Sequence, residues 1–199
     1  MKTKIFRVAD QVFVPAEISK FSQKSLDDFE TFWRSRIQLE LQDGIYWNWL
    51  NKNRLYISRD NYEAYAIENE SEQITQGMML IETQNHRSKV DQRKRIVYVE
   101  TLETAPWNRQ NSEPAPQFKR VGTALLRFAQ WRSQELGYDG IVGLHSLPES
   151  EVFYRNQNMM DCGQDPAKGD LRDSQKIIDP LFTLEITGIA HSYSSDFLK

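Results

Sequence analysis

The sequence contains a single cysteine, Cys162, in 199 residues, so no disulfide can form within the chain. That composition suits a reducing compartment. Cys162 is expected to be a packed residue, because no histidine or basic cluster stands beside it. No stretch approaches the roughly 20 apolar residues of a membrane span, and the N-terminus lacks the apolar run of a signal peptide. These absences predict a cytoplasmic protein without a membrane segment.

Neither sign of charge dominates, because 25 Lys and Arg residues stand against 28 Asp and Glu residues, a formal net charge of -3. A near-neutral chain lacks the basic surface on which nucleic-acid binding depends, so a nucleic-acid partner is disfavoured. The one dense basic run covers residues 86–95. It is expected to be a solvated loop, and the alternative is a patch for an anion or an acidic partner.

Aromatic side chains are plentiful, with five Trp, eight Tyr and ten Phe residues. Disordered chains lack such core-forming groups, and 199 residues fit one medium-sized domain. We therefore predict a single domain over residues 1–199, with an N-terminal helical region at about 20–52.

A helix is predicted over residues 26–42, with Ser25 as its N-cap and Asp28 as the partner of Ser25 in a capping box. The apolar stripe that predicts this helix consists of Leu26, Phe29, Trp33, Ile37 and Leu41. Two tryptophans follow, Trp47 and Trp49, and they belong either to the core or to the wall of a ligand site.

Strands are predicted at 62–68 and 77–83, because both segments are rich in β-branched, aromatic or other apolar residues and a polar turn separates them. They would form an antiparallel hairpin. A third strand is predicted over 96–104.

Beyond residue 104 the pattern changes to alternating helices and buried strands. A helix is predicted over 121–136, a buried strand over 140–145, and another helix with Ser146 as its N-cap. The strands near residues 100 and 143 would be parallel neighbours. A final strand at 181–186 follows a loop at 163–179. The predicted fold class is α/β, with a mixed, mostly antiparallel sheet, a central parallel strand pair and helices on both faces.

Three segments resemble the GNAT N-acetyltransferase family, in that family's order along the chain. Residues 98–106, Tyr-Val-Glu-Thr-Leu-Glu-Thr-Ala-Pro, resemble its fourth strand. Residues 117–126, Gln-Phe-Lys-Arg-Val-Gly-Thr-Ala-Leu-Leu, resemble its Gln/Arg-x-x-Gly-x-Gly/Ala turn and the helix after it. Residues 152–159, Val-Phe-Tyr-Arg-Asn-Gln-Asn-Met, resemble its Phe-Tyr-x-x-x-Gly-Phe segment. The resemblance implies a GNAT fold whose acetyl-CoA-binding core covers residues 95–160 or so.

The resemblance further implies that acetyl-CoA binds at the turn and along the strand before it, without a metal. Backbone N–H groups at a helix N-terminus bind a diphosphate, aided by the helix dipole. Gly122 would let the backbone approach closely, and Lys119 and Arg120 would add positive charge beside the anion. The expected coenzyme-binding residues are Leu102, Glu103, Thr104, Gln117, Phe118, Lys119, Arg120, Val121, Gly122, Thr123, Ala124, Tyr154 and Arg155.

The sequence departs from the family's pattern at two glycine positions. Arg120 stands at the first glycine of the turn, and Asn158 stands at the glycine of the last segment, where Asn still tolerates a left-handed backbone. Arg109, in an insert at 107–116, competes with Gln117 for the first position of the turn. We prefer Gln117, because its spacing to the helix start fits.

Acyl transfer to an amine needs a base for the ammonium and a proton donor for the departing thiolate. Glu100 is the preferred base and Glu103 the second choice, and alternation places them on opposite faces of their strand unless a bulge intervenes. His145 is a third candidate, because the reference pKa of histidine suits the task; it is otherwise a hydrogen-bonded core residue. Tyr154 occupies the place where the family's tyrosine commonly protonates the thiolate, and its alternative role is core packing.

The resemblance implies an enzyme that moves an acetyl group from acetyl-CoA to a primary amine by direct attack on the thioester, as a monomer or homodimer. The identity of the acceptor amine does not follow from the sequence. One alternative is a catalytically degenerate module that binds an acyl-CoA as a sensor or partner-docking domain. Another is an interaction domain with no coenzyme.

Overall fold

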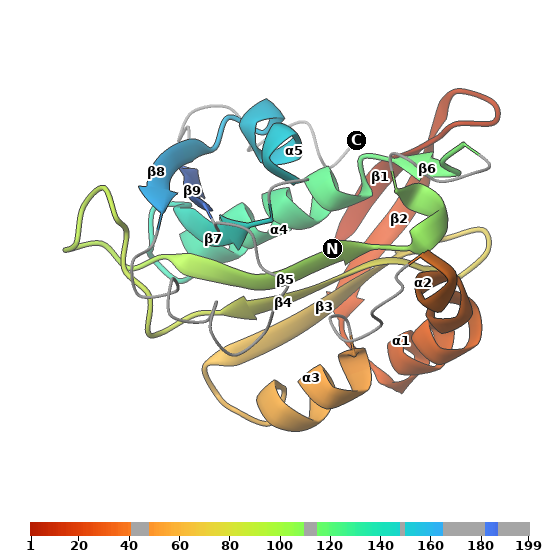
Figure 1. Ribbon diagram of the computed structural model, residues 1–199, viewed down its shortest axis with the longest axis horizontal. Helices are drawn as coiled ribbons and strands as arrows, with labels where there is room; N and C mark the ends of the chain where they lie inside the picture. The colour runs from red at the N-terminus through yellow and green to blue at the C-terminus, as the bar shows by residue number, and fades with distance from the viewer. Residues whose placement is uncertain (41–47, 110–114, 148–149, 165–181, 187–199) are drawn as a thin grey trace. The chain divides into compact units, whose positions relative to one another are not determined.

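The computed structural model describes residues 1–40, 48–109, 115–147, 150–164 and 182–186 (Figure 1). The chain forms two compact units, Met1–Ile81 with Thr101–Phe128, and Glu82–Glu100 with Ala129–Lys199. Strand β5 (Val97–Thr104) and helix α4 (Val121–Glu135) each have residues in both units.

The first unit is built on a sheet of order β6-β1-β2-β3-β4-β5. Besides β5, its strands are β1 (Lys2–Arg7), β2 (Val12–Lys20), β3 (Tyr62–Asn69), β4 (Thr75–Glu82) and β6 (Phe118–Lys119). β2 pairs antiparallel with β1 on one side and with β3 on the other. β3 and β4 are hydrogen-bonded neighbours joined by residues 70–74, as the predicted hairpin requires.

The hairpin of β1 and β2 was not predicted from the sequence. Val14, Ala16 and Ile18 alternate inward along β2, which is the period of a half-buried strand. Pro15 is exposed and stands between Val14 and Ala16 in keeping with that alternation, but a proline argues against an interior strand because it donates no ladder hydrogen bond. In β1 the only buried hydrophobic residue is Ile5, so its apolar signal is weak.

The predicted N-terminal helix exists but begins earlier than residue 26. It consists of α1 (Gln23–Asp28), a π-helical turn (Phe29–Trp33) and α2 (Arg34–Glu40). Its N-cap is Ser22, and the Oγ of Ser25 accepts the N–H of Ser22 at 3.3 Å, so the prediction of Ser25 as N-cap was wrong. Asp28 instead accepts the N–H of Thr75 at 2.8 Å, which ties the helix to β4.

The first unit also contains two short elements, α3 (Trp49–Tyr56) and the 3-10 turn η2 (Pro106–Asn108). α3 was not predicted, because Trp49 is its only buried residue and it has no apolar stripe. Leu41, the last residue of the predicted apolar stripe, and Trp47, the first of the two tryptophans, lie outside the described residues.

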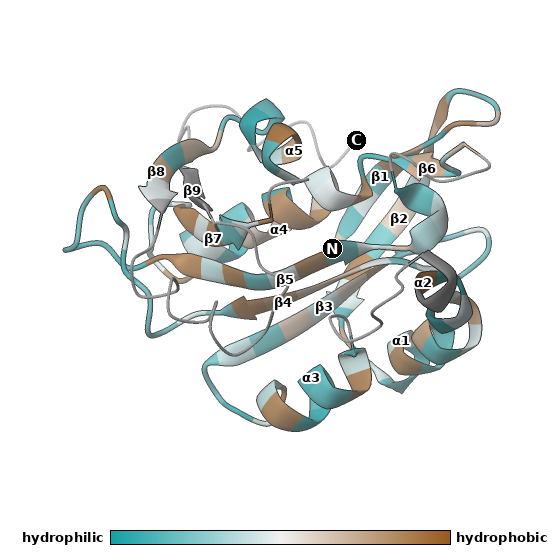
Figure 2. Cartoon of the chain, in the orientation of Figure 1, coloured by the Kyte–Doolittle hydropathy of each residue, from teal (hydrophilic) through white to brown (hydrophobic). Residues whose placement is uncertain are grey.

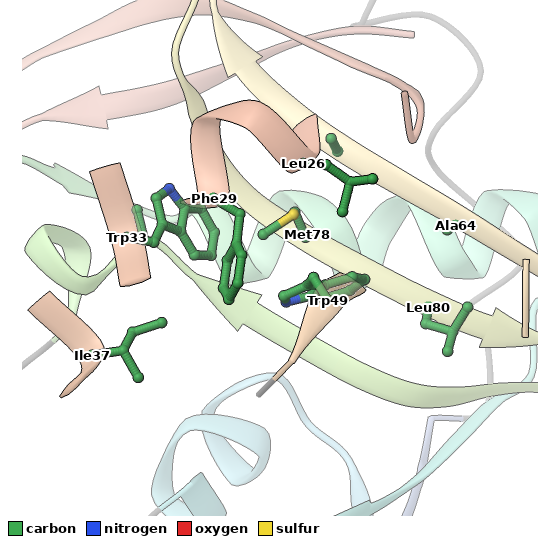
Figure 3. Packing of buried hydrophobic residues seen from close by; sticks show 10 residues of the cluster. Leu26, Phe29, Trp33, Ile37, Trp49, Ala64, Met78 and Leu80 are labelled. Carbon is green, nitrogen blue, oxygen red and sulfur yellow. The ribbon is translucent and has the colours of Figure 1, made fainter. Parts of the chain in front are cut away.

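Helices pack on both faces of β4. Met78 and Leu80 point to one face, into a core cluster with α1, the π-helical turn, α2 and α3, and Figure 3 shows the rings of Phe29, Trp33 and Trp49 gathered around Met78. Gly77 points to the other face, where an added Cβ would meet Cγ1 of Val121 at 2.7 Å, so α4 begins close against the strand. Helices on both faces were predicted, and this arrangement confirms them.

Helix α4 follows its predicted bounds to within one residue at its end. Figure 2 shows brown bands along it that alternate with paler and teal ones, as expected of an amphipathic helix. Its buried apolar residues are Val121, Ala124, Leu125, Leu126, Phe128 and Ala129. No helix within the described ranges has the length and apolar content that crossing a bilayer requires.

The second unit contains a sheet of order β5-β7-β9-β8. Its further elements are β7 (Val142–Ser146), α5 (Glu151–Asn156), β8 (Met160–Gln164) and β9 (Phe182–Ile186). β5 and β7 are parallel, with a register from Val97–Val142 to Val99–Leu144, which confirms the predicted parallel pair. β9 pairs antiparallel with β7 and with β8.

Two predictions for this unit were wrong. Ser146 is the last residue of β7, not a helix N-cap; α5 begins at Glu151, after Ser150. Gly163 and Gln164 belong to β8 and not to a loop, because β9 supplies a pairing partner that the local sequence does not reveal. The rest of the predicted loop, from residue 165, lies outside the described residues.

Candidate active site

The two glutamates of β5 face opposite ways, as the alternation predicted. Glu100 is exposed, whereas Glu103 is only 5% exposed. The partial desolvation that makes a carboxylate a useful base is therefore found at Glu103 and not at Glu100. Leu102 and Thr104 are half-buried on the face opposite Glu103.

The Glu103 carboxylate has a hydrogen-bond donor on each oxygen. Nε1 of Trp49 donates to Oε2 at 2.9 Å, and a guanidinium nitrogen of Arg109 donates to Oε1 at 3.0 Å. Burial raises the pKa of Glu103 to about 7, while the bonds from Trp49 and Arg109 and the charge of Lys52 act in the opposite direction. A carboxyl group with this pKa exchanges its proton near neutral pH, as a general base must.

The turn before α4 is held in place by the protein's own hydrogen bonds. The N–H of Gln117 donates to the carbonyl of Trp107 at 3.0 Å, and the N–H of Phe118 donates to Oδ1 of Asn108 at 2.9 Å. β6 also pairs antiparallel with β1. The amides of Gln117 and Phe118 are thus engaged within the protein and serve to fix the turn.

Arg120 adopts the backbone conformation that a glycine would favour at its position. Its φ is 67°, in the left-handed region, which costs a non-glycine residue about 1 kcal/mol. Its exposed side chain lies over the ring of Phe13, with Cζ 5.4 Å from the ring centroid. The guanidinium therefore leaves the turn on the side of β2.

Helix α4 begins directly after this turn. The N–H of Ala124 donates to the carbonyl of Arg120 at 2.9 Å, the first helical bond. The N–H groups of Val121, Gly122 and Thr123 precede it and have no intrahelical acceptor by the geometry of an α-helix. Such groups, with the positive end of the helix dipole, can bind a diphosphate. Lys119, just before the helix, is exposed and adds positive charge.

Four predicted site residues lie in the second unit: Glu100, His145, Tyr154 and Arg155. Nδ1 of His145 is hydrogen-bonded with the hydroxyl of Tyr98, whose ring stacks on His86 with centroids 3.9 Å apart. This contact fits the alternative role of His145 as a hydrogen-bonded residue.

Tyr154 is 8% exposed, and burial raises its pKa to about 12. Its phenol is therefore protonated at neutral pH and available as a donor. Its neighbour Arg155 is exposed and pairs with Glu151 at 3.1 Å, one helical turn away. Asn158, after α5, has a φ of 59°, the left-handed backbone that an asparagine tolerates at this position.

Sequence reasoning missed two partners of the candidate base. Trp49 was assigned either to the core or to a ligand wall, and Arg109 was weighed only as a rival of Gln117. The Trp49–Glu103 contact joins residues 54 positions apart. The only local signal in the sequence was the pair Trp47 and Trp49, the second of which is the first residue of α3.

No family model matches the sequence, and no curated protein matches it. The fold is similar to that of an acetyltransferase of the GNAT family from Staphylococcus aureus, with 13% identity, a TM-score of 0.53, and coverage of 85% of this chain and 97% of that chain. A spermidine N-acetyltransferase from Vibrio cholerae in complex with CoA and spermine has 10% identity and a TM-score of 0.55, over 86% and 94% of the two chains. The N-acetyltransferase YlbP from Bacillus subtilis in complex with coenzyme A has 19% identity and a TM-score of 0.50, over 87% and 97%. The sheet of this chain has one parallel pair, β5–β7, and is otherwise antiparallel, with helices on both faces. These features and the similar structures lead to the same conclusion: the chain has the GNAT acetyltransferase fold.

Proposed function

We propose that the protein is an N-acetyltransferase that moves an acetyl group from acetyl-CoA to a primary amine. The observation that carries the proposal is a buried carboxylate near the end of β5, in the same compact unit as a helix start with three amides that lack intrahelical acceptors. Solved structures of this fold that hold coenzyme A support the choice of donor.

The coenzyme's diphosphate would bind at the amides of Val121, Gly122 and Thr123, with Lys119 beside it. Gln117 and Phe118 would support the turn without touching the ligand, because their amides are engaged elsewhere. The pantetheine would lie along the strand at Leu102 and Thr104.

Glu103 is the base in this proposal, in preference to Glu100. It would accept a proton from the ammonium of the acceptor, directly or through one water molecule, which leaves the amine nitrogen a lone pair. That nitrogen attacks the thioester carbonyl carbon, the carbon–sulfur bond breaks, and the coenzyme leaves as a thiolate. Tyr154 would donate its phenolic proton to the thiolate sulfur, and the second proton of the acylated nitrogen would return to the phenolate through water, which leaves a neutral amide and a neutral phenol.

Calorimetry and a thiol-release assay test this function. Acetyl-CoA should bind, and free coenzyme thiol should accumulate with at least one amine from a panel of polyamines, amino acids and peptides. Glu103→Gln should leave coenzyme affinity unchanged and lower kcat/KM by about 10²–10⁴-fold. Failure to bind acetyl-CoA would contradict the proposal, and binding without turnover on any amine would favour the sensor or docking module.

A further inference from the structure

We propose that Trp49 is a positioning residue for Glu103, presented to it by α3. The inference rests on the proposed function, because it concerns the group assigned there as the base. The indole Nε1 and Oε2 of Glu103 are 2.9 Å apart. Trp49 is fully buried and Glu103 nearly so, so water does not compete freely for either group.

The two donors on Glu103 fix the carboxylate without saturating it. Trp49 takes one oxygen and Arg109 the other. Each carboxylate oxygen has two lone-pair sites, so one site on each oxygen remains for a proton in transit. A carboxylate held at both oxygens cannot turn about its terminal bond without breaking a hydrogen bond, and its proton-accepting directions are therefore set.

Trp49 is itself held rigidly. Its ring stacks on Phe21 with centroids 5.5 Å apart and an interplanar angle of 25°, and it belongs to the core cluster that includes Met78. An indole has one polar atom, which only donates. Because the ring is fixed by packing, the position of its N–H fixes where Oε2 can lie.

A second contact anchors α3 on the same face of β5. Lys52, three residues after Trp49, donates from Nζ to Oγ1 of Thr101 at 2.8 Å. Thr101 precedes Glu103 by two residues and is also buried, so both side chains point to α3. Two side-chain hydrogen bonds, from Trp49 and from Lys52, thus hold α3 in place against β5.

The indole also affects the pH at which Glu103 gives up its proton. The charged groups that act on Glu103 are Arg109 and Lys52, and both favour the carboxylate. The Trp49 N–H favours it too, without carrying a formal charge. Loss of that hydrogen bond should make the carboxyl group hold its proton to higher pH.

Trp49→Phe tests the inference, with Trp33→Phe as the matched control. Trp33 is also fully buried in the same cluster, but its Nε1 donates to the carbonyl of Thr75 at 3.2 Å and not to a carboxylate. The pH midpoint of kcat/KM should rise by about one unit in Trp49→Phe and stay unchanged in Trp33→Phe. Equal midpoints in the two variants would overturn the inference.

A second measurement needs neither turnover nor a change at Trp49. In the wild-type protein, the NMR signal of the Trp49 indole N–H should shift with pH as Glu103 titrates, and the shift should vanish in Glu103→Gln. A Trp49 signal that ignores pH across the neutral range would overturn the inference. The NMR titration tests the role of Trp49 even if no amine is acetylated. A lack of acetylation would count against the proposed function and not against this inference.

Discussion

Glu103 shows how one residue can be suited to proton transfer at the expense of stability. Burial raises its pKa from 4.5 to about 7. Between those values the folded chain binds more protons at this group than the unfolded chain does. Stability contributed by the protonated group is therefore lost as pH rises through this window.

We predict that Glu103→Gln flattens the pH dependence of the free energy of unfolding. The shift in the pKa of Glu103 corresponds to about 3 kcal/mol lost by the wild-type protein over that window. Urea unfolding at a series of pH values measures this loss in both proteins. Matching pH slopes for wild type and variant would show that Glu103 ionises as easily in the fold as in water.

Tyr154→Phe removes a hydroxyl and keeps the ring that packs beside Phe153, with centroids 5.0 Å apart. We expect kcat to fall by about 10–100-fold, since a positioned acid contributes 10²-fold or more and water replaces it in part. Coenzyme affinity should stay nearly unchanged. Steady-state kinetics with the preferred amine checks this, and an unaltered kcat would leave Tyr154 a packing residue.

At the scale of elements, β4 and α4 approach each other closely at Gly77. A methyl group on Gly77 would meet Cγ1 of Val121 at 2.7 Å, and Ile67 and Leu125 at 3.1 Å. Gly77→Ala should therefore destabilise the protein by about 1–3 kcal/mol through overpacking. It should also weaken coenzyme binding, because α4 would shift at its N-terminal end.

Val121→Ala offers the matched compensation, since it removes the clashing methyl group. The double variant should be less destabilised than the sum of the two single variants, as measured by urea unfolding. Additive losses would mean that α4 does not press on β4 at this point.

Elements with a strong period were predictable from sequence, and elements fixed by distant contacts were not. The strands around Ile67, Met79 and Val99 and the helix from Val121 lie where the pattern placed them. α3 escaped because it is bound to the sheet by Trp49 and Lys52 and not by an apolar stripe.

The features of the candidate site also fall into those that the sequence predicts and those that only tertiary contacts determine. The turn and both glutamates follow from order and spacing along the chain. The choice between Glu100 and Glu103 depends on which face α3 covers, and that is a tertiary property. The hydrogen bonds of Trp49 and Arg109 that hold the carboxylate likewise appear only in the folded chain.

For the molecule as a whole, coenzyme binding should appear as thermal stabilisation. Acetyl-CoA at 100 times its Kd contributes about 2.7 kcal/mol, which raises the Tm of a chain of this size by about 5–10 °C. Gly122→Asp should abolish the increase, because it puts a carboxylate at the proposed diphosphate position. A scan with increasing acetyl-CoA measures the shift, and an equal shift in the variant would place the coenzyme elsewhere.

The left-handed turn at Arg120 has a consequence for how this fold is recognised from an amino-acid sequence. The bend that a glycine would normally signal is made here by an arginine whose guanidinium rests on Phe13. A pattern keyed to the letter G scores this position as a loss, although the path of the main chain is kept. The left-handed backbone of the turn is therefore kept at a position where the glycine that usually identifies such turns is replaced by arginine.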